Sequence, residues 1–170
     1  MADRLKTTIR YYGISPWEIE VLYGLLDSHF EVIQEEEDPF DEDYVSVLEA
    51  SIPLEFSAAF FEWFTFKRWE KVKAIFKEMK RRRGSGNAIR VTVRFAGNPG
   101  ISFRVDARDR QWFDNALEKM DFVLELLPYH LDPASLPGGT DTLEYVFDAS
   151  TTRWRRDRAG GRRFRDGAWS

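Results

Sequence analysis

The stretch AIRVTVRFAGNPGISFRVDAR, residues 88–108, contains two runs in which apolar and polar side chains alternate. The apolar positions are every second residue: Ile89, Val91, Val93, Phe95, Ile101, Phe103 and Val105. This period is typical of strands with one buried face, and the GNPG between the runs is typical of a turn. The stretch therefore predicts a β-hairpin. Its other face presents three basic residues: Arg90, Arg94 and Arg104.

A helix is expected over residues 14–30, where apolar residues recur at helical spacing. Ser15 and Glu18 form the S-x-x-E pattern of a capping box, and Pro16 suits the first helical position. These three residues predict where the helix begins.

Two further helices are predicted from the same spacing. One spans 67–83 and is followed by Gly84, a natural helix terminator. The other begins after Asp109, which is placed to cap it, and is expected to end at Pro128. The aromatic-rich segment 51–66 fits neither period, and we interpret it as either a buried segment or the face of an interface.

Four more strands complete the expected order β-α-β-β-α-β-β-α-β, at residues 6–13, 30–34, 44–50 and 142–150. The economical fold is α+β: a two-layer sandwich in which helices cover one face of a mainly antiparallel sheet. A ferredoxin-like core with additions is one candidate. We expect residues 1–150 to form a single domain and residues 151–170 to form an extended arm.

An acidic run, EVIQEEEDPFDED at 31–43, is expected to be an exposed loop because its carboxylates repel one another and Pro39 interrupts it. Its candidate partner-binding residues are Glu35, Glu36, Glu37, Asp38, Asp41, Glu42 and Asp43. It lacks the residue order of a calcium loop, so we expect a solvated face or a partner surface.

Basic residues dominate the predicted helix 67–83. The candidate basic face consists of Lys67, Arg68, Lys71, Lys77, Lys80, Arg81, Arg82 and Arg83. Such a face, with the arginines of the hairpin, is either solvated or in contact with phosphate groups of a nucleic acid.

The C-terminal arm is dense in arginine and interleaved with aromatic residues. Its candidate binding residues are Arg153, Trp154, Arg155, Arg156, Arg158, Arg162, Arg163, Phe164 and Arg165. Arginine and aromatic residues are enriched at protein interfaces, and arginine pairs with carboxylates in a bidentate manner. We expect an arm that becomes ordered on a protein partner. A disordered tail and a nucleic-acid-binding arm are the alternatives.

Charge is unevenly distributed along the chain. Residues 1–66 have a net charge of −12 and residues 67–170 have a net charge of +8. Either the two signs cancel within one folded subunit, or the molecule has an acidic and a basic pole. Opposite poles favour head-to-tail contacts between copies, which form rings or filaments.

Motifs for catalysis, metals and cofactors are not found. The chain has no cysteine, and its two histidines, His29 and His130, lack metal-ligand spacing. The glycines of RRRGSGNA follow a helix, whereas a dinucleotide fingerprint opens one. We therefore expect a protein that is not an enzyme and has no cofactor or metal. Without a signal-peptide pattern or a long apolar run, a cytoplasmic location and no membrane contact are expected.

The arm resembles the Arg-Asp…Gly-Arg-Phe element of phage tail and minor virion proteins. Here Arg156-Asp157 is followed by Gly161-Arg162 and then Arg163-Phe164, with one extra arginine before the phenylalanine. The resemblance is confined to the arm. It implies a virion or prophage assembly component whose subunits interlock through extended arms.

The leading hypothesis is a non-enzymatic assembly protein that forms a homo-oligomer or joins a larger complex through oppositely charged surfaces and its arm. The first alternative is a nucleic-acid-associated protein that uses the basic helix and the arm. The second is an inhibitor or immunity-type module whose acidic run binds a basic partner.

Overall fold

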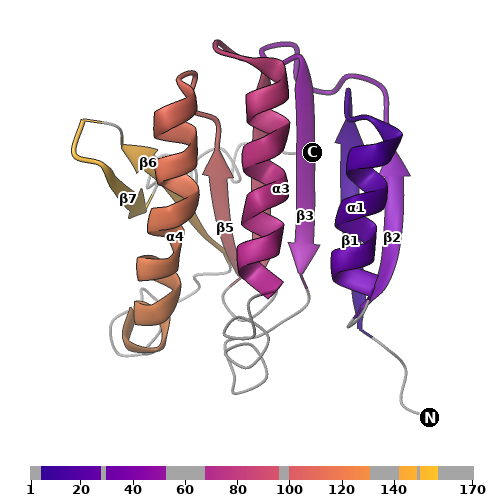
Figure 1. Cartoon of the computed structure of the whole chain (residues 1–170). Helices are drawn as coiled ribbons and strands as arrows, with labels where there is room; N and C mark the ends of the chain where they lie inside the picture. Colours follow the sequence, from indigo (N-terminus) through magenta and orange to yellow (C-terminus); the bar gives the residue numbers. More distant parts are fainter. Residues whose placement is uncertain are drawn as a thin grey trace.

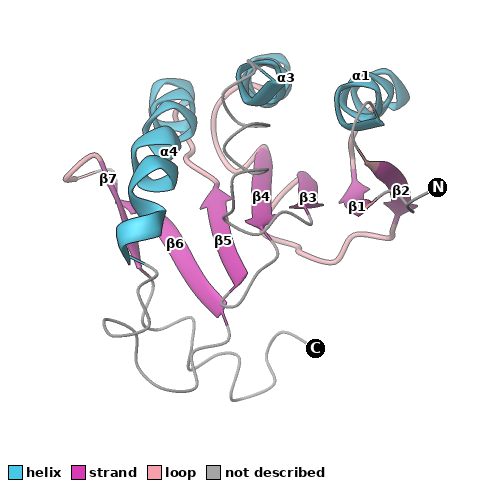
Figure 2. Cartoon of the chain, turned by 90° about the horizontal axis from the view of Figure 1, so that it is seen from below, coloured by secondary structure: helices cyan, strands magenta, loops and turns pink. Residues whose placement is uncertain are grey.

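The computed structural model describes residues 5–27, 30–52, 68–95, 100–130, 142–148 and 150–156, except for the side chains of Arg68, 125–130 and Thr142. The described residues form three helices, which cover one face of a seven-stranded sheet (Figures 1 and 2). The strands are β1 Lys6–Tyr12, β2 Glu31–Glu36, β3 Ser46–Ile52, β4 Ile89–Phe95, β5 Gly100–Val105, β6 Thr142–Asp148 and β7 Arg153–Arg156. The helices are α1 Pro16–Asp27, α3 Arg68–Arg83 and α4 Arg110–His130. The predicted α+β class with helices on one face is confirmed.

The sheet has the order β2-β1-β3-β4-β5-β6-β7. The pairs β1–β2, β3–β4 and β5–β6 are parallel, and the three pairs between them are antiparallel, so the sheet is mixed. Each parallel pair is the two ends of one β-α-β unit. The order differs from the ferredoxin-like candidate, in which another strand separates the two strands of each β-α-β unit.

The third β-α-β unit has the opposite hand to the first two. β1 and β5 run in the same direction, yet β2 and β6 lie on opposite sides of them while all three helices lie on one face (Figure 1). Seen from the helix side with β1 pointing upward, β2 lies to the right of β1 (Figure 1). The β1–α1–β2 connection is therefore right-handed, which is the usual hand. The β5–α4–β6 connection is therefore left-handed, a hand found in only about 2% of such units. The β4–β5 pairing explains this, because β4 occupies the side of β5 where a right-handed connection would place β6.

The core lies between the sheet and the helices. Alternate residues of the hairpin β4–β5 face it, as predicted, and Val93 and Phe103 are register partners that are both fully buried. Trp69 and Phe76 of α3 and Phe113 of α4 are also buried and belong to the same cluster. The predicted alternation therefore positions the hairpin correctly, with its polar residues on the face that none of the described helices covers.

Local capping signals are confirmed. The backbone N–H of Glu18 donates to Ser15 Oγ at 3.2 Å, and the backbone N–H of Ser15 donates to Glu18 Oε1 at 3.1 Å, which is a reciprocal capping box. Asp109 Oδ1 accepts from the backbone N–H of Gln111 at 2.8 Å and caps α4. Both helices begin where the sequence predicts.

Two of the differences in boundaries from the prediction have a clear physical reason. α4 continues through Pro128 to His130, because a proline in the last turn removes only one of the final backbone hydrogen bonds. β2 extends to Glu36, into the acidic run that was expected to be a loop. An edge strand with exposed side chains tolerates these glutamates because they alternate between the two faces. Most of segment 51–66 lies outside the described residues.

The predicted arm begins inside the domain. Residues Arg153–Arg156 form β7, which pairs antiparallel with β6. Trp154 accounts for this, since its Nε1 donates to the backbone oxygen of Ala116 at 2.9 Å and its ring contacts Phe103 and Phe147 edge-on. Residues 153–156, which are predicted from the sequence to belong to the arm, therefore form part of the sheet. Residues 157–170, with Arg158, Arg162, Arg163, Phe164 and Arg165, lie outside the described residues.

Candidate functional site: the charged face and edges of the sheet

The predicted basic face of α3 is largely neutralised within the molecule. Lys80 is fully buried, and its Nζ donates to the backbone oxygens of Gly86 and Arg108 at 3.2 and 2.9 Å. Burial lowers the pKa of Lys80, with Asp109 and Asp114 opposing it. Other members have carboxylate partners: Lys77 with Glu118, Arg81 with Glu78 and Arg83 with Glu18. Lys71 and Arg82 are exposed, while Lys67 and the side chain of Arg68 lie outside the described residues.

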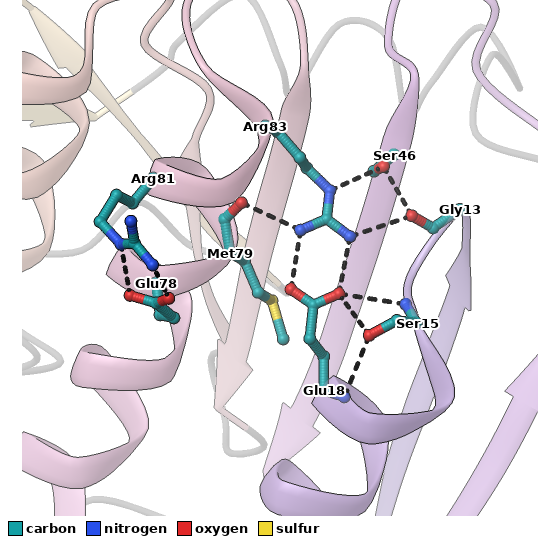
Figure 3. A network of polar contacts seen from close by, with 8 residues as sticks. All are labelled: Gly13, Ser15, Glu18, Ser46, Glu78, Met79, Arg81 and Arg83. Atoms are coloured by element: carbon teal, nitrogen blue, oxygen red, sulfur yellow. Dashed lines mark hydrogen bonds and ion pairs between the residues drawn. The ribbon is translucent and has the colours of Figure 1, made fainter.

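Arg83 and Glu18 form a buried ion pair that joins α3 to α1 (Figure 3). Arg83 Nη1 and Nη2 each donate to one carboxylate oxygen of Glu18 at 2.8 Å. Arg83 also donates to Ser46 Oγ and to the backbone oxygens of Gly13 and Met79, at 2.9 to 3.1 Å. All five N–H donors of the guanidinium are thus used. Arg83 is consequently a structural residue and not part of a basic binding face.

Three carboxylates surround Lys73 between α3 and α4. Asp121, Glu70 and Glu118 place oxygens 2.7, 2.8 and 3.3 Å from its buried Nζ. Burial lowers the pKa of Lys73, but hydrogen bonds to Asp121 and Glu70 outweigh this and raise it. Oxygens of the three acids lie within 4.8 Å of one another, a spacing that a metal ion could bridge. The Lys73 ammonium lies among them and supplies the positive charge that they require.

The uncovered face of the sheet, which lies opposite the described helices, carries a network of ion pairs. Glu49 of β3 is 6% exposed and receives three arginines. Its carboxylate lies 3.1 Å from Arg94, 3.6 Å from Arg90 and 3.8 Å from Arg10. Arg90 and Arg94, predicted as a basic surface of the hairpin, are therefore paired with a buried acid of the same chain.

The acidic run also folds against this face beyond β2. Asp41 forms an ion pair with Arg90, and the Tyr12 hydroxyl contacts the backbone oxygens of Asp41 and Tyr44. Arg10 lies 3.8 Å from the centre of the Phe40 ring. The expected exposed loop is thus partly packed, because arginines of the sheet neutralise its acids. Glu42 and Asp43 remain exposed, as does Asp38.

Tyr44 closes the same end of the face. Its hydroxyl donates to Asp106 Oδ2 at 3.0 Å. Burial, together with the neighbouring Asp106 carboxylate, raises the pKa of Tyr44 to about 12. The phenol is therefore fixed as a hydrogen-bond donor that joins the residue after the acidic run to the residue after β5.

A shallow hollow lies beside Glu49 on this face, over β4, β5 and β6. Its lining includes Arg94, Ser102, Arg104 and Glu144. Arg104, the third arginine of the predicted hairpin surface, and Glu144 both have interaction partners. The lining has both signs of charge, so the hollow does not define the charge of a ligand.

A row of register partners crosses the whole uncovered face, one residue from each strand. In sheet order it reads Glu35, Arg10, Glu49, Thr92, Arg104, Val146 and Arg155. Charges alternate in sign at its β2 end, and the row terminates in an exposed glutamate on β2 and an exposed arginine on β7. The sequence could not reveal this row, because its members are brought together only by the strand order.

The two outer strands have opposite charge. β2 contains three exposed glutamates, Glu31, Glu35 and Glu36, and Glu37 follows it. β7 contains three exposed arginines: Arg153, Arg155 and Arg156. Within the described part of the chain, neither strand has a hydrogen-bonded strand on its outer side.

No protein-family model, curated protein or solved structure matches the chain. None of the described helices has the length and apolarity needed to cross a membrane.

Proposed function

We propose that the protein is a non-enzymatic assembly protein that associates through oppositely charged surfaces of its sheet and its C-terminal arm. The observation that carries the proposal is the opposite charge of the two outer strands, acidic on β2 and basic on β7. The sequence predicts an acidic and a basic pole, and the opposite charges of these two strands support that prediction.

Edge strands present unpaired backbone N–H and C=O groups, which readily pair with another chain. Opposite charges on two surfaces increase the rate and specificity of their encounter. In the sequence, residues 157–170 follow β7 directly and contain four further arginines. Through the resemblance of this arm, the proposal includes a virion-like assembly.

The nucleic-acid alternative has less support than the sequence indicated. Lys80, Arg83 and Arg90 would have been among its phosphate contacts, and each is bound to groups of its own chain. The inhibitor alternative is weakened in the same way, since Asp41 of the acidic run is paired with Arg90. Assembly through the two edges depends on none of these residues.

The test is light scattering of the full chain at about 50 mM and about 500 mM salt, across a range of protein concentrations. We expect a mean mass above the 20.0 kDa of one chain at low salt, and a decrease at high salt. Deletion of residues 157–170 should reduce the association. A mass of 20.0 kDa under every condition would contradict the proposal.

A further inference from the structure

Among the described residues, no strand continues the row across the uncovered face beyond either of its ends. The row begins with Glu35 on β2 and ends with Arg155 on β7, and these two residues carry opposite charges. A second copy placed edge to edge would continue the row, with Arg155 of one copy beside Glu35 of the next. The alternation of sign at the β2 end of the row would then extend across the junction.

Strand direction permits this continuation. Between β2 and β7 there are three antiparallel pairings, so the two outer strands run in opposite directions within one copy. Copies related by simple displacement along the sheet would therefore place β7 and β2 as antiparallel neighbours. Antiparallel neighbours form the more stable type of ladder.

We infer that copies of the chain join edge to edge, with β7 of one copy pairing antiparallel with β2 of the next to form a continuous sheet. This inference rests on the proposed function and specifies its partner, a second copy, and its surfaces. If the row continues in register, Arg155 faces Glu35, Arg153 faces Glu37 and Arg156 faces Gln34. The helices of successive copies then lie on the same side of the sheet.

Charge also excludes the competing pairings of the same edges. Two β2 strands would bring glutamates together, and two β7 strands would bring arginines together, and like charges directly opposite in a sheet are destabilising. Only the unlike edges are complementary. Such a contact is heterologous, so it leaves one free edge at each end and produces an open chain or, with suitable twist, a ring.

Charge reversal of the two row ends tests the inference by light scattering at low salt. Glu35→Arg and Arg155→Glu should each weaken self-association by about a hundredfold, because each places like charges at the junction. An equimolar mixture of the two variants should restore association, since an arginine and a glutamate face each other at every mixed junction. Matched controls are Glu20→Arg, at an exposed position of α1, and Arg110→Glu, at the exposed start of α4, and both should associate like the unmodified chain.

A backbone variant separates strand pairing from simple charge attraction. The N–H groups of Glu31 and Glu37 donate to the backbone oxygens of Leu5, just before β1, and of Tyr11 in β1. Alternation along the strand therefore directs the N–H of Gln34 outward. Gln34→Pro should then block the β2 edge without loss of the β1 pairing, and should abolish association.

The outcomes distinguish this inference from the proposed function. Association that is unchanged by Glu35→Arg, Arg155→Glu and Gln34→Pro, or that is not restored in the mixture, would overturn edge-to-edge pairing and leave assembly through another surface. If the unmodified chain never associates, both the edge-to-edge pairing and the proposed assembly function are overturned. Reduced association in the three edge variants, restored by mixing the two charge reversals, supports the inference.

Discussion

Arg83 at the C-terminal end of α3 holds the carboxylate of Glu18 at the N-terminal end of α1 through two hydrogen bonds of 2.8 Å each. Glu18 is simultaneously the acid of the capping box with Ser15. One buried pair therefore caps a helix and joins the first β-α-β unit to the second.

Replacement of Arg83 with methionine should destabilise the protein by about 3–5 kcal/mol, because it leaves Glu18 charged, buried and without its partner. Urea unfolding monitored by tryptophan fluorescence measures the change. The double variant Glu18→Gln/Arg83→Met removes both charges and should recover part of the loss. Arg82→Met, at the exposed neighbouring position, is the control and should be nearly neutral. Equal loss in the single and double variants would contradict an unpaired buried charge as the cause.

Acid should weaken the protein partly through Glu18. Burial by itself would raise the pKa of Glu18, but hydrogen bonds from Arg83 and Ser15 outweigh it and lower the pKa to about 2 from 4.5. A lowered pKa in the folded state contributes stability that is complete above pH 4.5 and is lost as pH falls toward 2. The contribution is about 3 kcal/mol.

The measurement is the free energy of unfolding between about pH 7 and about pH 2. Glu18→Gln should be less stable than the unmodified chain at neutral pH, and the difference should shrink as pH falls. A constant difference across the titration would show that Glu18 has no role in the acid response.

Lys73→Met should destabilise the interface between α3 and α4 by about 3–5 kcal/mol at neutral pH, because three carboxylates lose the ammonium that neutralises them. Burial raises the pKa of Asp121, although Lys73 and Trp69 oppose this, so Asp121 protonates early as pH falls. The loss should therefore diminish in acid. Lys71→Met, an exposed lysine on the same helix, is the matched control. A loss independent of pH would indicate packing and not charge.

Local sequence signals predicted most of the fold. The capping box at Ser15 and Glu18, the cap at Asp109 and the alternation in 89–105 each depend on residues close in sequence, and all three are confirmed. The order of elements follows from them. The strand order does not, because the left-handed connection after β5 is imposed by the edge that β4 already occupies.

Surface chemistry was less predictable than secondary structure. Lysines and arginines on a helix are normally assigned to solvent, yet Lys80 binds two backbone oxygens and Arg83 binds an acid 65 positions earlier in the chain. β7 was missed because RWRR has a single apolar residue, and only the space beside α4 that Trp154 fills makes it a strand. These outcomes depend on tertiary contacts that no local pattern encodes.

Gly13→Ala and Gly24→Ala should have opposite effects on stability. Gly13 has a φ of +68°, and an added Cβ would lie 2.7 Å from the backbone oxygen of Val45. We expect the free energy of unfolding to fall by about 1–3 kcal/mol, because the backbone is strained and Val45, just before β3, is forced to move. Gly24 lies within α1 with nothing within 4 Å of an added Cβ, so its replacement should stabilise the helix by about 0.5–1 kcal/mol. Thermal unfolding of both variants measures these changes. A Gly13→Ala protein with the same melting temperature as the unmodified chain would contradict the assigned turn.

Trp154 should determine whether β7 remains attached to the sheet. Its indole N–H donates a hydrogen bond to the backbone oxygen of Ala116 in α4, and its ring packs against Phe103 and Phe147. Trp154→Ala should cost about 3–5 kcal/mol, and Trp154→Phe should cost less, because the phenyl ring keeps the packing and loses only the hydrogen bond. Trp17, which is 54% exposed, provides the control, and Trp17→Ala should cost far less.

Hydrogen exchange distinguishes local detachment from global unfolding in these variants. If Trp154 anchors β7, Trp154→Ala should increase amide exchange in Arg153–Arg156 and in β6 more than in β1 or β3. The same variant should lose the self-association proposed for the β7 edge, because a detached strand presents no ordered ladder to a neighbouring copy. Unchanged exchange in β7 after the loss of Trp154 would mean that the pairing with β6 holds the strand without its anchor.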